Sequence, residues 1–592
     1  MKLSFLLLLC CANLFSQSVP EKWLTYYEQS GYKKTPRYKE TMEYCRKLEK
    51  ASPWIKVTNF GKSPEGRDLP LVIVSKEQAF DPQKAAKSGK VIMLIQNGIH
   101  SGEIEGKDAS LMLLRDIAIT KTKASLLDHV ILLVIPIYNV DGHERFGPYN
   151  RINQNGPEEM GWRVTSQNLN LNRDYMKADA PETQFWLRLF NDWLPDFFVD
   201  CHVTDGADYQ YVVTFGIENT PNVAPPVREW ITQKFLPQIS SLKTNGNIPV
   251  GQLIFLRDDL DPMKGLAGVS GTAPPRFSTV YTTLQNRPGV LIEMHMLKDY
   301  KSRVEGNYEM LDAIIQKLNA ENASLRSAVR RADEQTTSGL PHTYALTYRG
   351  DTLPNHNVTY AGFRQKNEAS DISTGTRRSY TREPFEASVP AYDSVIVDKT
   401  VEMPFAYLIP QQYQTIIYRL KLHGIKFDRL TSPVDIDVER YRLTKPKWAT
   451  APFEGHIGVT TTTEKFREKT SFPAGTIVVP MHQRTAKVAA QLLEPDAPDS
   501  FVGWGFFDAI FEQKEYAEDY VMEKVSREMM QRDPKLRQDF DDKVASDSGF
   551  AKSASARLNF FYEHSPYWDN QINLYPVARL MTETSLSTDR TK

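Results

Sequence analysis

The stretch VIMLIQNGIHSGEIEGKDASLMLLRDI, residues 91–117, decides the fold that we expect for this chain. Its first residues are almost all apolar, which is typical of a strand that is buried on both faces of a sheet. From Glu105 to Ile117 apolar residues recur at helical spacing, so the strand is followed directly by an amphipathic helix. Two polar residues, His100 and Glu103, lie at the turn between the two elements.

Similar apolar runs recur along the first 330 residues, at VILLVIPIY (130–138), FFVDCH (197–202) and GVLIE (289–293). Buried strands that alternate with helical segments predict an α/β fold, in which helices cover both faces of a mostly parallel sheet. In such sheets functional groups collect beyond the carboxyl ends of the strands. We therefore expect the chemistry of this protein at that edge.

The length and charge of the chain limit its organisation and its partners. A chain of 592 residues exceeds what one hydrophobic core usually serves. We expect a signal peptide over 1–16, a catalytic domain over 17–335, a β-rich segment over 336–400 and an α/β to helical region over 401–592. The 72 Lys and Arg residues nearly balance the 73 Asp and Glu residues, and no dense basic run is visible. This composition argues against a nucleic-acid partner.

The first residues, MKLSFLLLLCCANLFSQS, have the layout of a secretory signal peptide, which predicts export to the periplasm or the medium. The apolar run is too short for a membrane anchor, and no second segment of the sequence is long and apolar enough to cross a bilayer. Lipidation at Cys10 or Cys11 stays open. Only Cys45 and Cys201 follow the signal, so a disulfide framework is not expected, and Cys201 is interpreted as a buried thiol.

Three residues at strand ends have the composition of a catalytic metal site. His100 and Glu103 share an H-x-x-E spacing, and His202 ends the run FFVDCH. Two histidines and one glutamate leave the fourth position of tetrahedral zinc open for water, unlike a closed structural site. Each residue alone is equally consistent with a surface loop or a satisfied strand-end histidine. Together they predict one zinc ion.

A glutamate ends the strand GVLIE. A carboxylate at the end of a buried strand is costly without a partner or a function. Glu293 could take a proton from a zinc-bound water and return it to a leaving amine. The alternative is a structural salt bridge with Arg287 or Arg303.

The segment GWRVTSQNLNLNRDY, residues 161–175, carries two arginines between these strands. Arg173 with Asn172 could hold a substrate carboxylate through a planar, bidentate fork. Arg163 could stabilise the oxyanion that forms when water adds to a carbonyl. Taken one by one, such arginines are more often solvated surface residues.

These motifs resemble, in order, those of the zinc carboxypeptidases of the carboxypeptidase A type. The motifs are GKSPEGRDL (61–69), IHSGE (99–103), NVDGHERF (139–146), WR (162–163), LNRDY (171–175) and DCH (200–202). The resemblance implies a twisted, eight-stranded mixed sheet with helices on both faces. It also implies zinc ligands at His100, Glu103 and His202, an oxyanion arginine at Arg163, carboxylate recognition by Asn172 and Arg173, and a catalytic glutamate at Glu293.

The sequence departs from the family pattern at three points. The flank of Glu293 matches loosely, so Glu305 is the second choice for the catalytic glutamate. Asn170 replaces a family aspartate that orients the first zinc histidine, which predicts a less basic ligand. Tyr281 is our candidate for the family's mobile substrate-binding tyrosine, although its spacing to Glu293 is short.

The resemblance covers part of the C-terminal region and also implies a function. The stretch VPMHQRTAKVAAQLLEPDAPDS (479–500) also resembles extensions on exported bacterial members of the family. The expected activity is hydrolysis of the C-terminal peptide bond of a peptide with a free carboxylate, by zinc-activated water. Two alternatives are an amidase or deacylase acting on peptidoglycan stem peptides or N-acyl amino acids, and an inactive protein that binds peptides.

Overall fold

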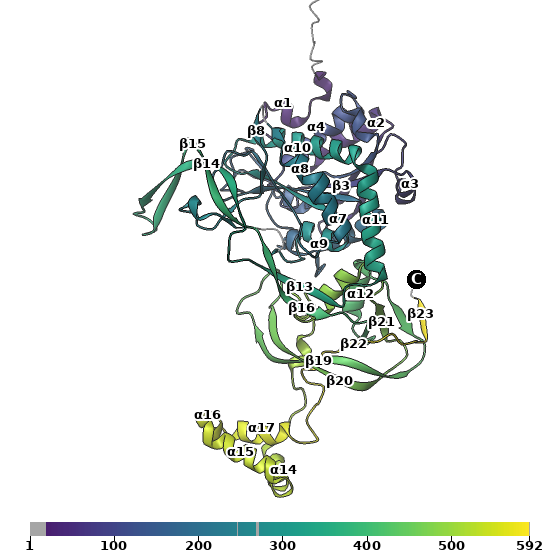
Figure 1. Ribbon diagram of the computed structural model, residues 1–592, viewed down its shortest axis with the longest axis vertical. Helices are drawn as coiled ribbons and strands as arrows, with labels where there is room; N and C mark the ends of the chain where they lie inside the picture. Colours follow the sequence, from purple (N-terminus) through teal and green to yellow (C-terminus); the bar gives the residue numbers. More distant parts are fainter. Residues whose placement is uncertain (1–18, 245–246, 268–271, 591–592) are drawn as a thin grey trace, which may run out of the picture. The chain divides into compact units, whose positions relative to one another are not determined.

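The computed structural model describes residues 19–244, 247–267 and 272–590 (Figure 1). The predicted signal peptide lies outside the described residues. The chain divides into two compact units. Among the described residues, unit 1 comprises those up to 339, 347–400 and 422–424, and unit 2 comprises 340–346, 401–421 and those from 425 onward. In the described part of the chain, no helix has the length and apolar character needed to cross a membrane.

Unit 1 is built on an eight-stranded sheet. In spatial order its strands are β1 (Ile55–Lys62), β2 (Asp68–Val74), β4 (Val130–Ile135), β3 (Val91–Asn97), β5 (Phe197–Thr204), β12 (Gly289–His295), β6 (Val213–Ile217) and β9 (Gly251–Gln252). The central strands β4, β3, β5 and β12 run parallel. β1 pairs antiparallel with β2, β2 with β4, and β6 with β12, whereas β9 runs parallel to β6. The expected mixed α/β sheet is thus confirmed.

Helices cover both faces of this sheet. They are α1 (Tyr26–Gln29), α2 (Tyr38–Ala51), α3 (Pro82–Lys87), α4 (Glu105–Ala118), α5 (Val140–Glu144), α6 (Pro181–Trp193), α7 (Pro225–Trp230), α8 (Leu236–Ile239), α9 (Ser278–Leu284), α10 (Tyr300–Ala320) and α11 (Asn322–Ser338). Successive side chains of a strand point to opposite faces. Met93 of β3 therefore packs in the core with α4, α10 and α11, while Phe198 of β5 contacts Trp186 of α6 on the other face.

A second, smaller sheet extends unit 1. Its order is β10 (Phe255–Leu256), β11 (Leu266–Ala267), β15 (Thr376–Tyr392) and β14 (His356–Ala369). The long strands β14 and β15 form a two-stranded arm (Figure 1). Two further pairs are β7 (Lys243–Thr244) with β8 (Ile248–Pro249) and β13 (Thr343–Gly350) with β16 (Val395–Glu402). Residues 347–400 thus return to unit 1 long after its central sheet is complete.

Unit 2 has its own sheet and core. The sheet order is β20 (Val459–Phe472), β19 (Val434–Trp448), β22 (Ala578–Leu580), β17 (Ala406–Ile409), β21 (Ile477–Pro480), β18 (Asp428–Leu430) and β23 (Thr588–Arg590). Its helices are α12 (Gln414–Leu422), whose last residue falls in unit 1, α13 (Ala486–Leu493), α14 (Asp519–Arg532), α15 (Pro534–Ser546), α16 (Ser548–Lys552) and α17 (Ala554–Glu563). The helices α14 to α17 enclose a small aromatic core of their own.

Candidate metal centre and active site

The turn after β3 carries the first two candidate ligands. β3 ends at Asn97, and Gly98 adopts a left-handed conformation with φ of 65°, which a residue without a side chain tolerates easily. The chain then closes a tight turn, in which the Glu103 amide donates to the His100 carbonyl at 2.9 Å, before α4 begins at Glu105. The predicted change from strand to helix is what brings His100 and Glu103 to the carboxyl edge of the sheet.

The third candidate ligand, His202, and the candidate base, Glu293, come from neighbouring parallel strands. His202 lies near the end of β5, and Glu293 lies opposite it on β12 in the strand register. Paired residues of parallel neighbours project to the same face of a sheet. The register therefore places the glutamate directly beside the second histidine.

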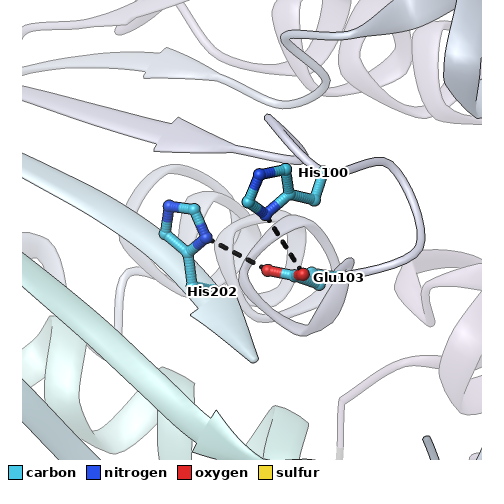
Figure 2. Close-up of side chains that lie close together, drawn as sticks. All are labelled: His100, Glu103 and His202. Carbon is cyan, nitrogen blue, oxygen red and sulfur yellow. Dashed lines mark hydrogen bonds and ion pairs between the residues drawn. The ribbon is translucent and has the colours of Figure 1, made fainter. Parts of the chain in front are cut away.

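The three candidate ligands converge on one point (Figure 2). Nδ1 of His100 lies 3.1 Å from Oε1 of Glu103, and Nδ1 of His202 lies 3.1 Å from Oε2 of the same carboxylate. One ligand atom from each residue lies within 4.8 Å of the others, and all three side chains are buried. Zinc bonds of about 2.0–2.1 Å in a tetrahedral site place ligand atoms about 3.3 Å apart, so this spacing fits zinc.

The protonation of His100 supports a cation at this point. Oδ1 of Asn170 accepts the Asn172 amide at 3.1 Å, which identifies this atom as the oxygen, and it also lies 3.1 Å from Nε2 of His100. Nε2 must then carry the hydrogen, and Nδ1 directs a lone pair at Oε1 of Glu103. Burial lowers the pKa of His100 to about 4, which disfavours a second proton. Two lone pairs face each other, and a metal ion would relieve this repulsion.

His202 is held by carboxylates on both sides. Its Nε2 lies 3.0 Å from Oδ2 of Asp200, which also accepts the Ser278 hydroxyl at 2.5 Å. Burial alone would lower the pKa of His202, but the Asp200 carboxylate outweighs it and holds this pKa well above its usual value. A carboxylate on the far nitrogen of a histidine is the arrangement that orients imidazole ligands at metal sites.

Glu103 is stabilised as an anion. Burial would raise its pKa, but His100 and Arg151 outweigh that cost and hold the pKa well below its usual value. The Val203 amide also donates to Oε2 at 3.1 Å. An ionised carboxylate is the form in which this side chain binds a metal.

Glu293 faces the same cavity as the three candidate ligands. Burial, with the nearby carboxylates of Glu103 and Asp200, raises its pKa to about 8. Its Oε2 is buried and has no hydrogen-bond partner among the described residues.

The alternatives to Glu293 are engaged elsewhere. Arg287 pairs with Asp333 at 2.9 Å, and Arg303 pairs with Glu105 at 2.8 Å, so both arginines considered as salt-bridge partners of Glu293 have other carboxylates. Glu305 pairs with Lys301 on the surface of α10. Of the two candidates for the catalytic glutamate, Glu293 lines the cavity and Glu305 does not.

The predicted arginines border the same cavity, which has a volume of about 1100 Å³. Nη1 of Arg163 lies 3.4 Å from Oε1 of Glu103. Asn172 accepts the Ser278 amide through Oδ1 at 3.1 Å, and Arg173 donates to the Asn172 carbonyl at 2.8 Å. The Arg173 guanidinium stacks on Phe277, with 4.1 Å between the guanidinium carbon and the ring centroid.

Arg151 is a site residue that the sequence did not suggest. Its Nη2 lies 2.8 Å from Oε1 of Glu103, and it also lines the cavity. A Cβ on Gly102 would lie 2.6 Å from Cγ of Arg151, so the absence of a side chain there makes room for the arginine. The only signal in the sequence was that glycine inside the H-x-x-E motif, and it could not identify a partner 49 residues away.

Tyr281 is not where a substrate-binding tyrosine is required. It is fully buried on α9, where its ring packs against Trp186 and Phe190. Its hydroxyl lies 2.9 Å from Nδ1 of His423. The cavity is instead lined by Phe277, Thr279 and Val280, so the face of α9 that carries Tyr281 is turned to the interior. The structure does not bring our candidate into the site.

Two of the short motifs meet behind the metal centre. Asp141, in the NVDG segment, accepts the Ser63 hydroxyl at 2.7 Å and pairs with Arg67 at 2.7 Å, both from GKSPEGRDL. Asn139 accepts the Ser101 hydroxyl through its carbonyl at 2.6 Å. These contacts tie the loop of His100 and Glu103 to two other turns, which gives the motifs a positioning role.

Comparison with known proteins agrees with this geometry. Residues 41–206, which include the three candidate ligands, match the zinc carboxypeptidase family model. Carboxypeptidase 2 of Trichophyton rubrum is 25% identical over 488 residues, covering 79% of this chain and 84% of that protein, and Carboxypeptidase 2 of Trichophyton equinum is 25% identical over 490 residues with the same coverage.

Among solved structures, a metallo-carboxypeptidase from Burkholderia cenocepacia is 15% identical, covers 48% of this chain and 69% of its own, and has a TM-score of 0.34. Residues 41–206 of this chain are thus similar to the zinc carboxypeptidase family, and the chain resembles curated carboxypeptidases over 79% of its length.

Proposed function

We propose that this protein is a metallocarboxypeptidase that holds one zinc ion with His100, Glu103 and His202 and removes the C-terminal residue of peptides. The observation that carries the proposal is the lone pair on Nδ1 of His100, which faces Glu103 at 3.1 Å where a cation fits and a proton is disfavoured. The match of residues 41–206 to the zinc carboxypeptidase family model supports the same metal and the same substrate class.

The residues around the candidate metal centre have separate roles in the proposed hydrolysis. A bound zinc ion supplies a Lewis acid for water and for the scissile carbonyl. Glu293 takes the proton of the attacking water and returns it to the leaving amine, a role that suits a carboxylate whose pKa is raised to about 8 by burial. Arg163, beside the metal centre, stabilises the oxyanion. Asn172 and Arg173 bind the C-terminal carboxylate of the peptide.

We also infer that the protein acts outside the cytoplasm. The inference rests on the signal-peptide pattern of residues 1–16. Its substrates are then peptides of the periplasm or of the medium.

The decisive experiment measures zinc content and peptide hydrolysis on the same purified protein. We expect one zinc per chain and cleavage of peptides with a free C-terminal carboxylate, but not of the same peptides with an amidated end. The Glu293→Gln variant should keep its zinc and lose about 10²–10⁴-fold in kcat, the usual contribution of a general base. Glu305→Gln, at the surface of α10, is the matched control and should behave like the parent protein.

Three results would contradict the proposal. Protein without stoichiometric zinc would remove the metal from the scheme. Unchanged turnover by Glu293→Gln would exclude Glu293 as the base. Cleavage of N-acyl amino acids or peptidoglycan stem peptides, with no cleavage of ordinary peptides, would identify an amidase instead.

A further inference from the structure

The cavity does not end at the metal centre. Part of its lining comes from residues 347–400, including Val358, Ala361, Glu386, Asp393 and Val395. This segment lies far beyond residues 41–206, which match the family model, and more than 50 residues after Glu293. We call it the distal wall, defined as the cavity-lining residues of 347–400.

The distal wall is fixed to the segment that follows His202. The Gln210 amide donates to the Ala361 carbonyl at 2.9 Å, and Tyr209 forms a β-bridge with Gly362. The side-chain amide of Gln210 reaches the Gly362 and Phe385 carbonyls at 3.2 and 3.1 Å. Backbone hydrogen bonds of this kind hold the base of the β14–β15 arm in one place relative to the metal centre.

Buried side chains reinforce this attachment. Tyr209 and Tyr360 are 1% exposed, and they pack with Val389 in one small apolar core. β11 pairs with β15 through Leu266 and Ala391, both of which line the cavity. The wall is therefore a structural part of the cavity in unit 1.

The charged side chains differ between the two ends of the cavity. The metal end carries Arg151, Arg163 and Arg173 beside the carboxylates of Glu103 and Glu293, whereas the distal wall carries Glu386, Asp393 and His356 and has no arginine or lysine among the described residues of the cavity lining. Nδ1 of His356 lies 3.6 Å from Oδ1 of Asp393, so this histidine is drawn to a carboxylate of the same wall. A peptide with its carboxylate at the arginines and a cation at the wall complements both ends.

We propose that the distal wall is a subsite for the upstream residues of an oligopeptide and that it favours a basic side chain there. The proposal rests on the carboxypeptidase function proposed above. Because Asn172 and Arg173 hold the C-terminal carboxylate in that scheme, the peptide chain can continue only upstream. The apolar side chains of Val358, Ala361 and Val395 would contact the peptide backbone and side-chain stems.

The test compares a series of peptides that share their last two residues and extend from two to six residues. We expect kcat/KM to rise with length and then to level off once the peptide is long enough to contact the wall. A lysine scanned along the upstream positions should be preferred over glutamate at one distal position, by about three- to fivefold for a partly exposed charge pair. In Glu386→Lys this ratio should invert, and a general loss of activity would not move it.

Glu383→Lys is the matched control, because Glu383 lies on the same strand and pairs with Arg364 in solvent. Equal kcat/KM for all lengths, a lysine preference confined to the C-terminal residue, or the same change of ratio in Glu383→Lys would each overturn the subsite.

A measurement of peptide binding tests the subsite independently of the proposed hydrolysis. The Kd of the lysine and glutamate pentapeptides is measured on zinc-loaded Glu293→Gln protein, with and without Glu386→Lys. If the parent protein hydrolysed no peptide, the proposed function would fail, but a lysine preference in Kd that inverts in Glu386→Lys would still support the subsite. Equal Kd values for the two peptides would overturn it.

Discussion

Asn170 shows how one residue tunes the candidate metal centre. The sequence marked it as a departure from the family's aspartate, and its Oδ1 lies 3.1 Å from Nε2 of His100. A neutral amide orients the imidazole as a carboxylate does, but it accepts the hydrogen bond from Nε2–H more weakly. The imidazole is then a less basic ligand. The contact predicted for position 170 is therefore present, with the weaker acceptor.

We predict that Asn170→Asp raises the affinity for zinc about tenfold, because a carboxylate at this position makes His100 a more basic ligand. Competition with a chromogenic chelator measures the effect without reference to turnover. Asn168→Asp adds the same charge at an exposed position two residues away and controls for net charge. Equal gains in the two variants would attribute the effect to charge alone.

Glu182 is a buried carboxyl group outside the site. Its side chain is fully buried in the first turn of α6, and neither carboxyl oxygen has a hydrogen-bond partner among the described residues. Burial raises its pKa from 4.5 to about 7. Between these pH values the folded protein holds a proton that the unfolded chain has released, so the free energy of unfolding falls as the pH rises.

We predict that the parent protein loses up to about 3 kcal/mol of stability from this group between pH 4.5 and 7, and that Glu182→Gln removes this loss. Chemical denaturation at several pH values gives the two curves, and their difference should grow towards neutral pH. Glu334→Gln, on the exposed face of α11, serves as the control. A constant difference across the range would show that Glu182 does not titrate in that window.

At the scale of elements, the contact between α4 and β5 positions two of the candidate ligands. Gly106 of α4 lies so close to the sheet that a Cβ there would be 2.4 Å from Cβ of Cys201 and 2.4 Å from Oδ1 of Asn97. Cys201 is buried, as the sequence indicated, and it precedes His202. The approach of helix to strand thus sets the separation of Glu103 and His202.

We predict that Gly106→Ala destabilises the protein by about 1–3 kcal/mol, the usual cost of overpacking a core, and that it weakens zinc binding by displacing β5. Denaturant unfolding and the chelator assay measure the two effects. Gly350→Ala is the matched control, because a Cβ there would meet no atom within 4 Å. If Gly106→Ala destabilised the protein but left zinc affinity unchanged, the contact between α4 and β5 would not determine the placement of the ligands.

At the scale of the whole molecule, the metal should affect one unit and spare the other. The three candidate ligands all belong to unit 1, whereas unit 2 has a separate apolar core around β17 and β21. A ligand that binds only the folded state stabilises it by RT ln(1 + [L]/Kd), about 4 kcal/mol when the ligand is at 1,000 times its Kd.

Removing the metal with a chelator should therefore speed hydrogen exchange in β3, β5 and α4 and leave β17 and β21 unchanged. Exchange followed by peptide mass spectrometry reads the two units in one sample. Restoring zinc should reverse the change. Equal changes in both units would contradict a metal that is confined to unit 1.

The sequence determined the parts of this protein that depend on neighbouring residues. Apolar runs and helical periodicity predicted β3, α4 and the mixed sheet, because burial on one or both faces leaves a local pattern. The motifs predicted His100, Glu103 and His202 as a group, since each motif ends a strand at the same edge.

The tertiary structure decided what depends on register and long-range packing. Glu293 lies beside His202 because of the register between two strands that are about 90 residues apart in the sequence. The ion pair of Arg151 with Glu103 requires the Arg151 side chain to approach Gly102 closely. Tyr281 was misplaced because helical spacing does not say which face of α9 meets the cavity. The distal wall could not be foreseen either, because backbone hydrogen bonds that bring residues 347–400 back to unit 1 leave no pattern in the sequence.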